Sequence, residues 1–133
     1  MIVWSNIYSV GVKEIDDQHK RFFDLINQVG ASAGTPEAVA MLPDIFRQLF
    51  AYAEYHFATE EKYFDLFKYE DADNHKKEHR HYEETVGKMK SRHDAGDAKV
   101  AKDLAEFMGN WLRDHISYSD KKYHRCFNDH GLR

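Results

Sequence analysis

Apolar side chains recur every three to four residues along four long stretches of the chain, which is the spacing of helices with one buried face. Glycine and proline, which interrupt helices, are rare, with seven and two copies among 133 residues. We expect a kink or a short break between Val39 and Pro43, because proline removes a backbone donor from a helix. The spacing predicts helices at about 17–32, from Thr35 to about Phe67, at about 74–94, and from about 98 to 117 or beyond.

The connections between these helices are short, so helices that follow one another should lie antiparallel. We predict an all-α fold, an up-down-up-down antiparallel four-helix bundle, as a single domain over residues 1–133. Residues 1–14 are predicted to form an irregular N-terminal arm. The arm should pack against the bundle, because Trp4, Ile7 and Tyr8 are too apolar to remain in water.

The charge balance and the cysteine content argue against several classes of partner. Nineteen Lys and Arg against twenty-three Asp and Glu give a formal net charge of -4, whereas nucleic-acid-binding domains carry basic surfaces. No stretch is long and apolar enough for a membrane span, and the N-terminus lacks a signal-peptide pattern. The single cysteine, Cys126, cannot form an internal disulfide. We therefore expect a cytoplasmic protein that does not bind nucleic acid and does not insert into membranes, and we expect it to be a monomer.

A histidine interrupts the apolar stripe of each helix, and two of the stripes also carry a carboxylate. Residues four apart share a helix face, separated by about 40°, so their side chains can meet at one atom. Burying such groups without partners costs several kcal/mol each, which a domain stable by about 5–15 kcal/mol cannot offset. Divalent metal would compensate them. The candidate metal ligands are His19, His56, Glu60, His75, His79, His115 and Asp120.

The composition of this donor set indicates which metal it suits. Five imidazoles and two carboxylates exceed the four ligands of one zinc ion and match two iron-type ions that share carboxylates. The Glu-x-x-His spacing of carboxylate-rich di-iron oxygenases occurs only at Glu78 to His81. The other histidines, His81, His93, His124 and His130, are expected to have structural or solvent-exposed roles.

The spacing on the fourth helix is irregular. His115 and Asp120 are five residues apart, which corresponds to about 140° of rotation around an α-helix. Both side chains can point inward only if the helix departs from regular geometry. We therefore expect a local irregularity, such as a π-type bulge, at residues 116–120.

These residues resemble the signature of the hemerythrin family in its short, single-domain bacterial form, and the resemblance covers essentially the whole chain. The resemblance implies that His75, His79 and His115 bind one iron and that His19 and His56 bind the other. It also implies that Glu60 and Asp120 bridge the two ions, together with an oxo or hydroxo group. The matching segments are Val10-Gly11-Val12, Ile15-Asp16-Asp17-Gln18-His19-Lys20, His56-x-x-x-Glu60-Glu61, His75-x-x-x-His79 and His115-x-x-x-x-Asp120.

The resemblance also implies reversible binding of O2 at the open position of the iron held by two histidines. Such binding requires a dry pocket, because a proton donor beside the bound oxygen would promote its release as peroxide. Apolar residues close to the candidate ligands should form the walls of this pocket. They are Phe22, Phe23, Trp111, Leu112 and Ile116, of which Trp111 and Ile116 also match pocket positions of the family.

We therefore expect an oxygen carrier or storage protein rather than an enzyme, with two Fe2+/Fe3+ ions as its cofactor. Its ligand would be O2, and an O2-consuming protein would be its recipient. Three alternatives remain open. The same centre could serve a sensor of O2, redox state or NO that acts through a separate partner, a weak di-iron peroxidase or oxidase, or a protein for iron storage or iron-centre repair.

Overall fold

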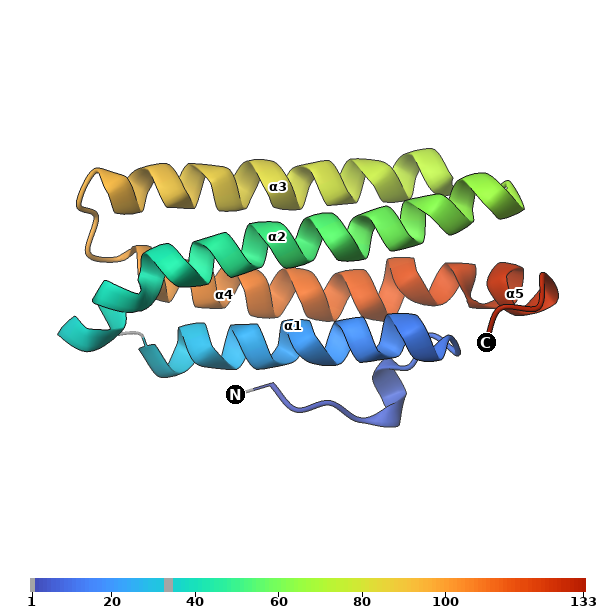
Figure 1. Cartoon of the computed structure of the whole chain (residues 1–133), viewed down its shortest axis with the longest axis horizontal. Coiled ribbons are helices and arrows are strands. Elements are labelled where there is room, and N and C mark those ends of the chain that lie inside the picture. Colours follow the sequence, from blue (N-terminus) through green and yellow to red (C-terminus); the bar gives the residue numbers. More distant parts are fainter. Residues whose placement is uncertain (1, 33–34) are drawn as a thin grey trace.

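The computed structural model describes residues 2–32 and 35–133. Its long helices lie antiparallel (Figure 1), and no strand occurs in these two ranges. The predicted four-helix bundle is therefore confirmed. The helices are α1 (Lys13–Ser32), α2 (Pro36–Phe67), α3 (Ala72–Asp94) and α4 (Val100–Asp114), followed by a π-helix, η2 (His115–Asp120), and by α5 (Lys121–Asp129).

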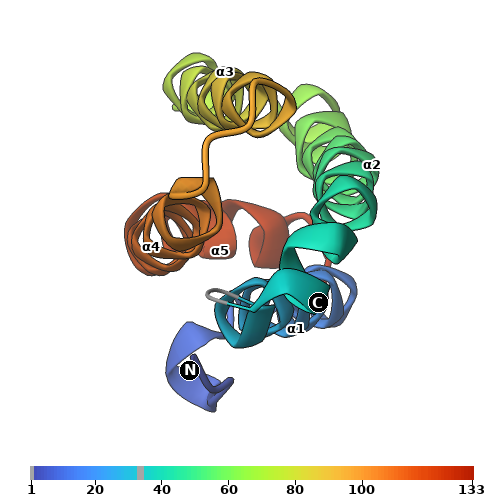
Figure 2. The same ribbon diagram turned by 90° about the vertical axis from the view of Figure 1, so that its left-hand side faces the viewer.

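The four long helices form a closed ring when they are seen end-on. Figure 2 places α1, α2, α3 and α4 at the corners of the bundle. Each helix packs against the next one in the chain, and α1 also packs against α4, which closes the ring. Side chains that face inward from all four helices can therefore meet at the centre.

The first long helix begins at Lys13, earlier than the predicted start near residue 17, so the arm ends at Val12 instead of residue 14. Val12 is fully buried, and its carbonyl accepts a hydrogen bond from the Asp16 backbone N–H at 2.9 Å. The Asp16 carboxylate accepts hydrogen bonds from Val10 N at 2.8 Å and Ser9 Oγ at 2.6 Å. These bonds fix the entry of the chain into the helix.

The arm contains one short 3-10 helix, η1 (Asn6–Tyr8), and lies along α1 (Figure 1). The backbone of Ile2 both donates to and accepts from the Asn27 side chain, at 2.9 Å and 2.8 Å. The rings of Trp4 and Tyr8 pack against Phe23, with centroid distances of 5.5 Å and 5.1 Å. The arm thus covers the outer side of α1.

Of the kink or short break expected near Val39 to Pro43, the break is absent, because the second long helix runs through Pro43 without interruption. Leu42, Ile45 and Phe46 around the proline are fully buried, and their packing holds this region helical. The side chain of Val39 is 43% exposed. We infer that water can therefore bond the carbonyl that loses its partner. The first turns of α2 lie at an angle to the rest of the helix in Figure 1.

The buried apolar side chains form two clusters, and five residues of the candidate site lie between them in sequence: His19, Glu60, His75, His79 and Asp120. The smaller cluster lies at the end of the bundle near the arm entry and α5, and it includes Val12, Ile15, Phe64 and Tyr123. The larger cluster occupies the other part of the bundle. A buried polar layer thus separates two apolar regions, and this layer needs its own stabilisation.

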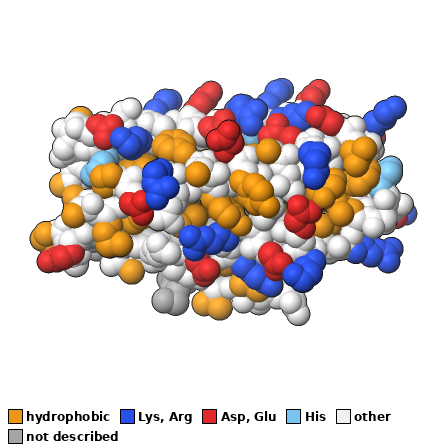
Figure 3. All heavy atoms as spheres, in the orientation of Figure 1, with side chains coloured by type: hydrophobic (Ala, Val, Ile, Leu, Met, Phe, Trp, Pro, Cys, Tyr) orange, Lys and Arg blue, Asp and Glu red, His pale blue; other side chains and the backbone are white. Residues whose placement is uncertain are grey.

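The surface carries charges of both signs. On the face seen in Figure 3, basic and acidic side chains alternate, and neither sign forms a large region. Among the described residues, no helix is long and apolar enough to cross a lipid bilayer.

Candidate metal centre

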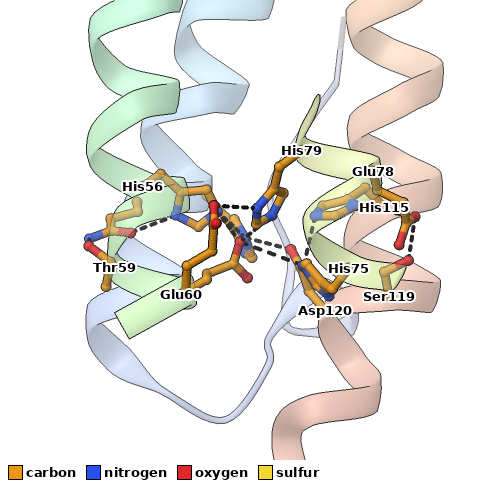
Figure 4. Close-up of polar contacts among 12 residues, drawn as sticks. His56, Thr59, Glu60, His75, Glu78, His79, His115, Ser119 and Asp120 are labelled. Carbon is orange, nitrogen blue, oxygen red and sulfur yellow. Dashed lines mark hydrogen bonds and ion pairs between the residues drawn. The ribbon is translucent and has the colours of Figure 1, made fainter. Parts of the chain in front are cut away.

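The seven predicted ligands come together in the buried polar layer (Figure 4). One comes from α1, two from one face of α2, two from one face of α3 and two from the ends of η2. Their solvent exposure is at most 3%. The pairs on α2 and α3 are each four residues apart, so a regular α-helix is sufficient to direct both side chains inward.

The pair on the fourth helix requires different backbone geometry. The chain is π-helical from His115 to Asp120, which confirms the predicted irregularity. A π-helix has more residues per turn than an α-helix, so residues five apart share a face. His115 Nε2 consequently lies 2.9 Å from Asp120 Oδ1.

The ligand atoms form two groups of four that share the carboxylate of Glu60, and within each group all atoms lie within 4.8 Å of one another. The carboxylate of Asp120 also faces histidines of both donor groups. Its Oδ1 lies 2.9 Å from His75 Nε2, and its Oδ2 lies 2.9 Å from His19 Nε2. One group consists of Glu60, His75, His79 and His115, and the other consists of His19, His56, Glu60 and Asp120.

Several atoms of this layer lack the hydrogen-bond partners that buried polar atoms normally have. Among the described residues, His75 Nε2, His115 Nε2, Glu60 Oε2 and both carboxylate oxygens of Asp120 are buried without one. His19 Nε2 faces His56 Nε2 at 3.1 Å, although two ring nitrogens can share at most one proton. Cations between the imidazoles and carboxylates would satisfy these atoms, so the donor set fits a metal centre.

The pKa shifts of these groups reflect a buried negative charge. Burial acts to lower the pKa of His75, but the carboxylates of Asp120 and Glu60 outweigh it and raise this pKa to about 10. Burial likewise acts on His115, whose pKa is raised to about 9 mainly by Asp120. Burial acts to raise the pKa of both carboxyls, but the facing imidazoles hold each well below its usual value. Both carboxylates are therefore ionised and require positive charge beside them.

Known proteins resemble this chain over most of its length. Residues 10–127 match the hemerythrin HHE cation binding domain. The chain belongs to the hemerythrin family. The bacteriohemerythrin of Methylococcus capsulatus is 32% identical over 124 residues, covering 91% of this chain and 92% of that protein. The bacteriohemerythrin of Clostridium acetobutylicum is 27% identical over 127 residues, covering 92% and 98%. A crystal structure of wild-type hemerythrin has a TM-score of 0.87 and 30% identity, covering 95% of this chain and 97% of that chain.

Hemerythrins bind non-haem iron, and this member of the family has two overlapping donor groups able to hold metal. Three further side chains, absent from the predicted site, lie beside the outward-facing ring nitrogens of its histidines. They lie on α1, α2 and α3, and each is next to a candidate ligand in the sequence. The pairs are Gln18 Oε1 with His56 Nδ1 at 2.6 Å, Glu61 Oε2 with His79 Nδ1 at 3.1 Å, and Glu78 Oε1 with His115 Nδ1 at 3.5 Å.

An outer hydrogen-bond acceptor fixes which ring nitrogen of a histidine carries the proton. His56 Nδ1 donates its proton to Gln18 Oε1, which leaves His56 Nε2 free to act as a ligand atom. Gln18 is held in turn by a hydrogen bond from its Nε2 to Thr59 Oγ1 at 3.3 Å. Among the described residues, His19 Nδ1 and His115 Nδ1 are both buried without a hydrogen-bond partner, although His115 Nδ1 has the carboxylate of Glu78 at 3.5 Å. The sequence offered one signal for finding these outer partners, because each is adjacent to a candidate ligand in the chain.

Two of the five predicted pocket residues pack on a histidine of the candidate metal centre. The ring of Phe22 meets His56 edge-on at a centroid distance of 5.4 Å. The indole of Trp111 stacks on His115 at 4.3 Å with an interplanar angle of 14°. Phe22 is fully buried and Trp111 is half-buried.

The other three predicted pocket residues belong to the larger apolar cluster. Leu112 and Ile116 are fully buried in it. Phe23 is buried in the same cluster, but its ring packs edge-on against the aromatic rings of the arm. Sequence reasoning missed Phe57, whose ring stacks on His79 at 3.8 Å with an interplanar angle of 7°.

The remaining histidines lie outside both donor groups. His124 links α5 to the arm, because its Nδ1 donates to the carbonyl of Val10 at 2.7 Å. Its ring lies against Gly11, which has a φ of +72°. His81, His93 and His130 each pack near an aromatic ring, those of Phe107, Phe46 and Phe67.

Proposed function

We propose that this hemerythrin-family chain binds O2 reversibly at a non-haem di-iron centre and acts as an oxygen carrier or storage protein, not as an enzyme. Two iron ions with an oxo or hydroxo bridge would be the cofactor, and in the ferrous state they would supply the electrons for reversible O2 binding. The seven ligands would be His19, His56, Glu60, His75, His79, His115 and Asp120.

The unequal number of histidines in the two donor groups carries this proposal. Three imidazoles surround Glu60 in one group, whereas only two belong to the other. If both carboxylates serve both ions, the second ion has one protein donor fewer than the first. That ion can therefore accept a small external molecule while both ions keep their protein ligands.

The side chains around the site favour reversible binding because they keep water and mobile protons away. Phe22, Leu112 and Ile116 are at most 1% exposed and offer no polar atom. Tyr82 and Tyr123 have buried hydroxyls, but burial raises the pKa of each well above its usual value. Both phenols therefore hold their protons and are poor acids. Such surroundings disfavour protonation of a bound oxygen molecule.

An oxygenation cycle tests the proposal. The iron-loaded protein is reduced anaerobically, exposed to air, and then purged with inert gas while its visible spectrum is recorded. A spectrum that changes in air and returns to the starting state over repeated cycles supports a carrier or storage role. Irreversible oxidation with release of peroxide would overturn it and favour an oxidase, a peroxidase or a redox sensor.

We further propose that the protein works in the cytoplasm as a monomer and passes O2 to an O2-consuming protein. The single free cysteine, Cys126, is in keeping with a reducing compartment. Sedimentation at micromolar concentration would test the oligomeric state, and a dimer would contradict it.

A further inference from the structure

The π-helix η2 brings His115 and Asp120 to one face, but π-helical geometry is rare and must be held by contacts outside the segment. The segment also contains Ser117 and Tyr118, which are exposed, and Ser119, which is 7% exposed. The hydroxyl of Ser119 donates a hydrogen bond to Glu78 Oε1 on α3 at 2.6 Å (Figure 4). This bond ties the end of η2 to the helix that carries His75 and His79.

The same oxygen of Glu78 also lies 3.5 Å from His115 Nδ1, at the beginning of η2. One carboxylate oxygen therefore faces both ends of the π-helical segment. This distance is an ion-pair contact and not a hydrogen bond, because His115 Nδ1 has no hydrogen-bond partner among the described residues. The carboxylate would still favour a proton on His115 Nδ1, which leaves His115 Nε2 free to act as a ligand atom on the inner side. Glu78 thus contacts both η2 and the His115 ring, and both must be correctly oriented for His115 and Asp120 to act as ligands.

In the described part of the chain, no Lys or Arg competes for the carboxylate of Glu78. Its side chain is 43% exposed, yet among residues 2–32 and 35–133 no Lys or Arg forms an ion pair with it. The neighbouring Glu83 differs, because Arg80 Nε contacts its carboxylate at 3.1 Å. The carboxylate of Glu78 is therefore directed at η2 and not at a surface cation.

We propose that Glu78 is a positioning residue that fixes the π-helical segment and the orientation of His115, through Ser119 Oγ and His115 Nδ1. The proposal rests on the proposed di-iron centre, since both ends of the segment would be iron ligands. Glu78 itself contributes no ligand atom to either donor group. Glu78 belongs to the Glu-x-x-His spacing noted in the sequence, which contributes no predicted iron ligand. The proposal therefore gives Glu78 a role outside the ligand set.

The test compares iron retention in full-length, iron-loaded variants. Glu78→Ala removes both contacts, Ser119→Ala removes one, and Glu78→Gln keeps an oxygen that can accept from the same groups. Glu84→Ala is the matched control, because Glu84 is an exposed glutamate on the same helix and forms no hydrogen bond or ion pair with another described residue. For each protein, the iron content, the rate of iron transfer to excess EDTA, the visible charge-transfer spectrum and the unfolding temperature are measured.

We expect Glu78→Ala to release iron about tenfold faster or more, in the range typical for loss of an outer partner of a metal ligand. Ser119→Ala should also release iron faster. A variant that combines Glu78→Ala with Ser119→Ala should be no worse than Glu78→Ala alone, because Glu78→Ala already removes the hydrogen bond that Ser119→Ala breaks. Glu78→Gln should stay close to the parent, and the spectrum should change only in the Ala variants.

Three results would overturn the proposal or its basis. Release rates within twofold of Glu84→Ala in both Ala variants would refute the positioning role. Fast release in Glu78→Gln as well, in proportion to a lower unfolding temperature, would refute it in favour of general stability. A parent protein that binds no iron would instead refute the proposed function, so the two failures are distinguishable.

Discussion

The indole ring of Trp111 lies nearly parallel to the imidazole of His115, with centroids 4.3 Å apart. Trp111 also packs against Tyr82 at 4.9 Å and Phe57 at 5.9 Å. Because Trp111 is half-buried, its ring lies between solvent and this side of the polar layer. The stack thus joins a candidate ligand to the apolar shell that should keep the site dry.

Replacing Trp111 should shorten the lifetime of the oxygenated protein without removing its iron. Trp111→Ala opens space that the core cannot fully close, so water gains access to the site. We expect iron near two per chain and a several-fold faster loss of the visible absorption that forms in air. Trp4→Ala is the control, since this second tryptophan packs on Phe23 in the arm. Equal decay in both variants and the parent would make Trp111 an ordinary core residue.

Removing histidines from one donor group should lower the iron content directly. His75 and His79 both belong to the group of three histidines. We expect the parent to carry two irons per chain and His75→Ala/His79→Ala to carry one or none, as measured by elemental analysis. His81→Ala provides the comparison, because His81 is exposed on the same helix and lies outside both groups. Two irons in the double variant would reject this ligand assignment.

Metal removal should destabilise the fold, because ligands that bind only the folded chain stabilise it by mass action. A free metal concentration a thousandfold above the dissociation constant would raise the free energy of unfolding by about 4 kcal/mol. We expect a lower unfolding temperature after chelation and its recovery when Fe2+ is added back. Acidification should act in the same direction, because imidazoles then bind protons in place of metal. Unfolding that is indifferent to chelation would contradict a metal held in the buried layer.

The entry of the arm should not tolerate a side chain at Gly11. A Cβ there would overlap the His124 ring, and the φ of +72° is strained for other residues. We expect Gly11→Ala to lower the free energy of unfolding by about 2–4 kcal/mol. At Gly109, in the middle of α4, nothing lies within 4 Å of an added Cβ. Gly109→Ala should instead raise stability by about 0.5–1 kcal/mol, and chemical denaturation would measure both.

Much of the site could be predicted because its geometry is local to single helices. His56 with Glu60, and His75 with His79, are four residues apart, and this spacing alone directs both side chains of each pair to one face. The five-residue spacing of His115 and Asp120 predicted the π-helix for the same reason. At Pro43 the local signal left a kink and a break both open, and the packing of buried neighbours excludes the break by holding the proline within a continuous helix.

The sequence by itself thus determined which face of each helix is buried and which polar residues interrupt it, since both follow from the helical repeat. Only the tertiary structure decided which side chains meet across helices. Glu78 was visible in the sequence, but its contacts with Ser119 and His115 depend on how α3 is rotated against η2. That rotation is set by the packing of the whole core, which no single helix encodes.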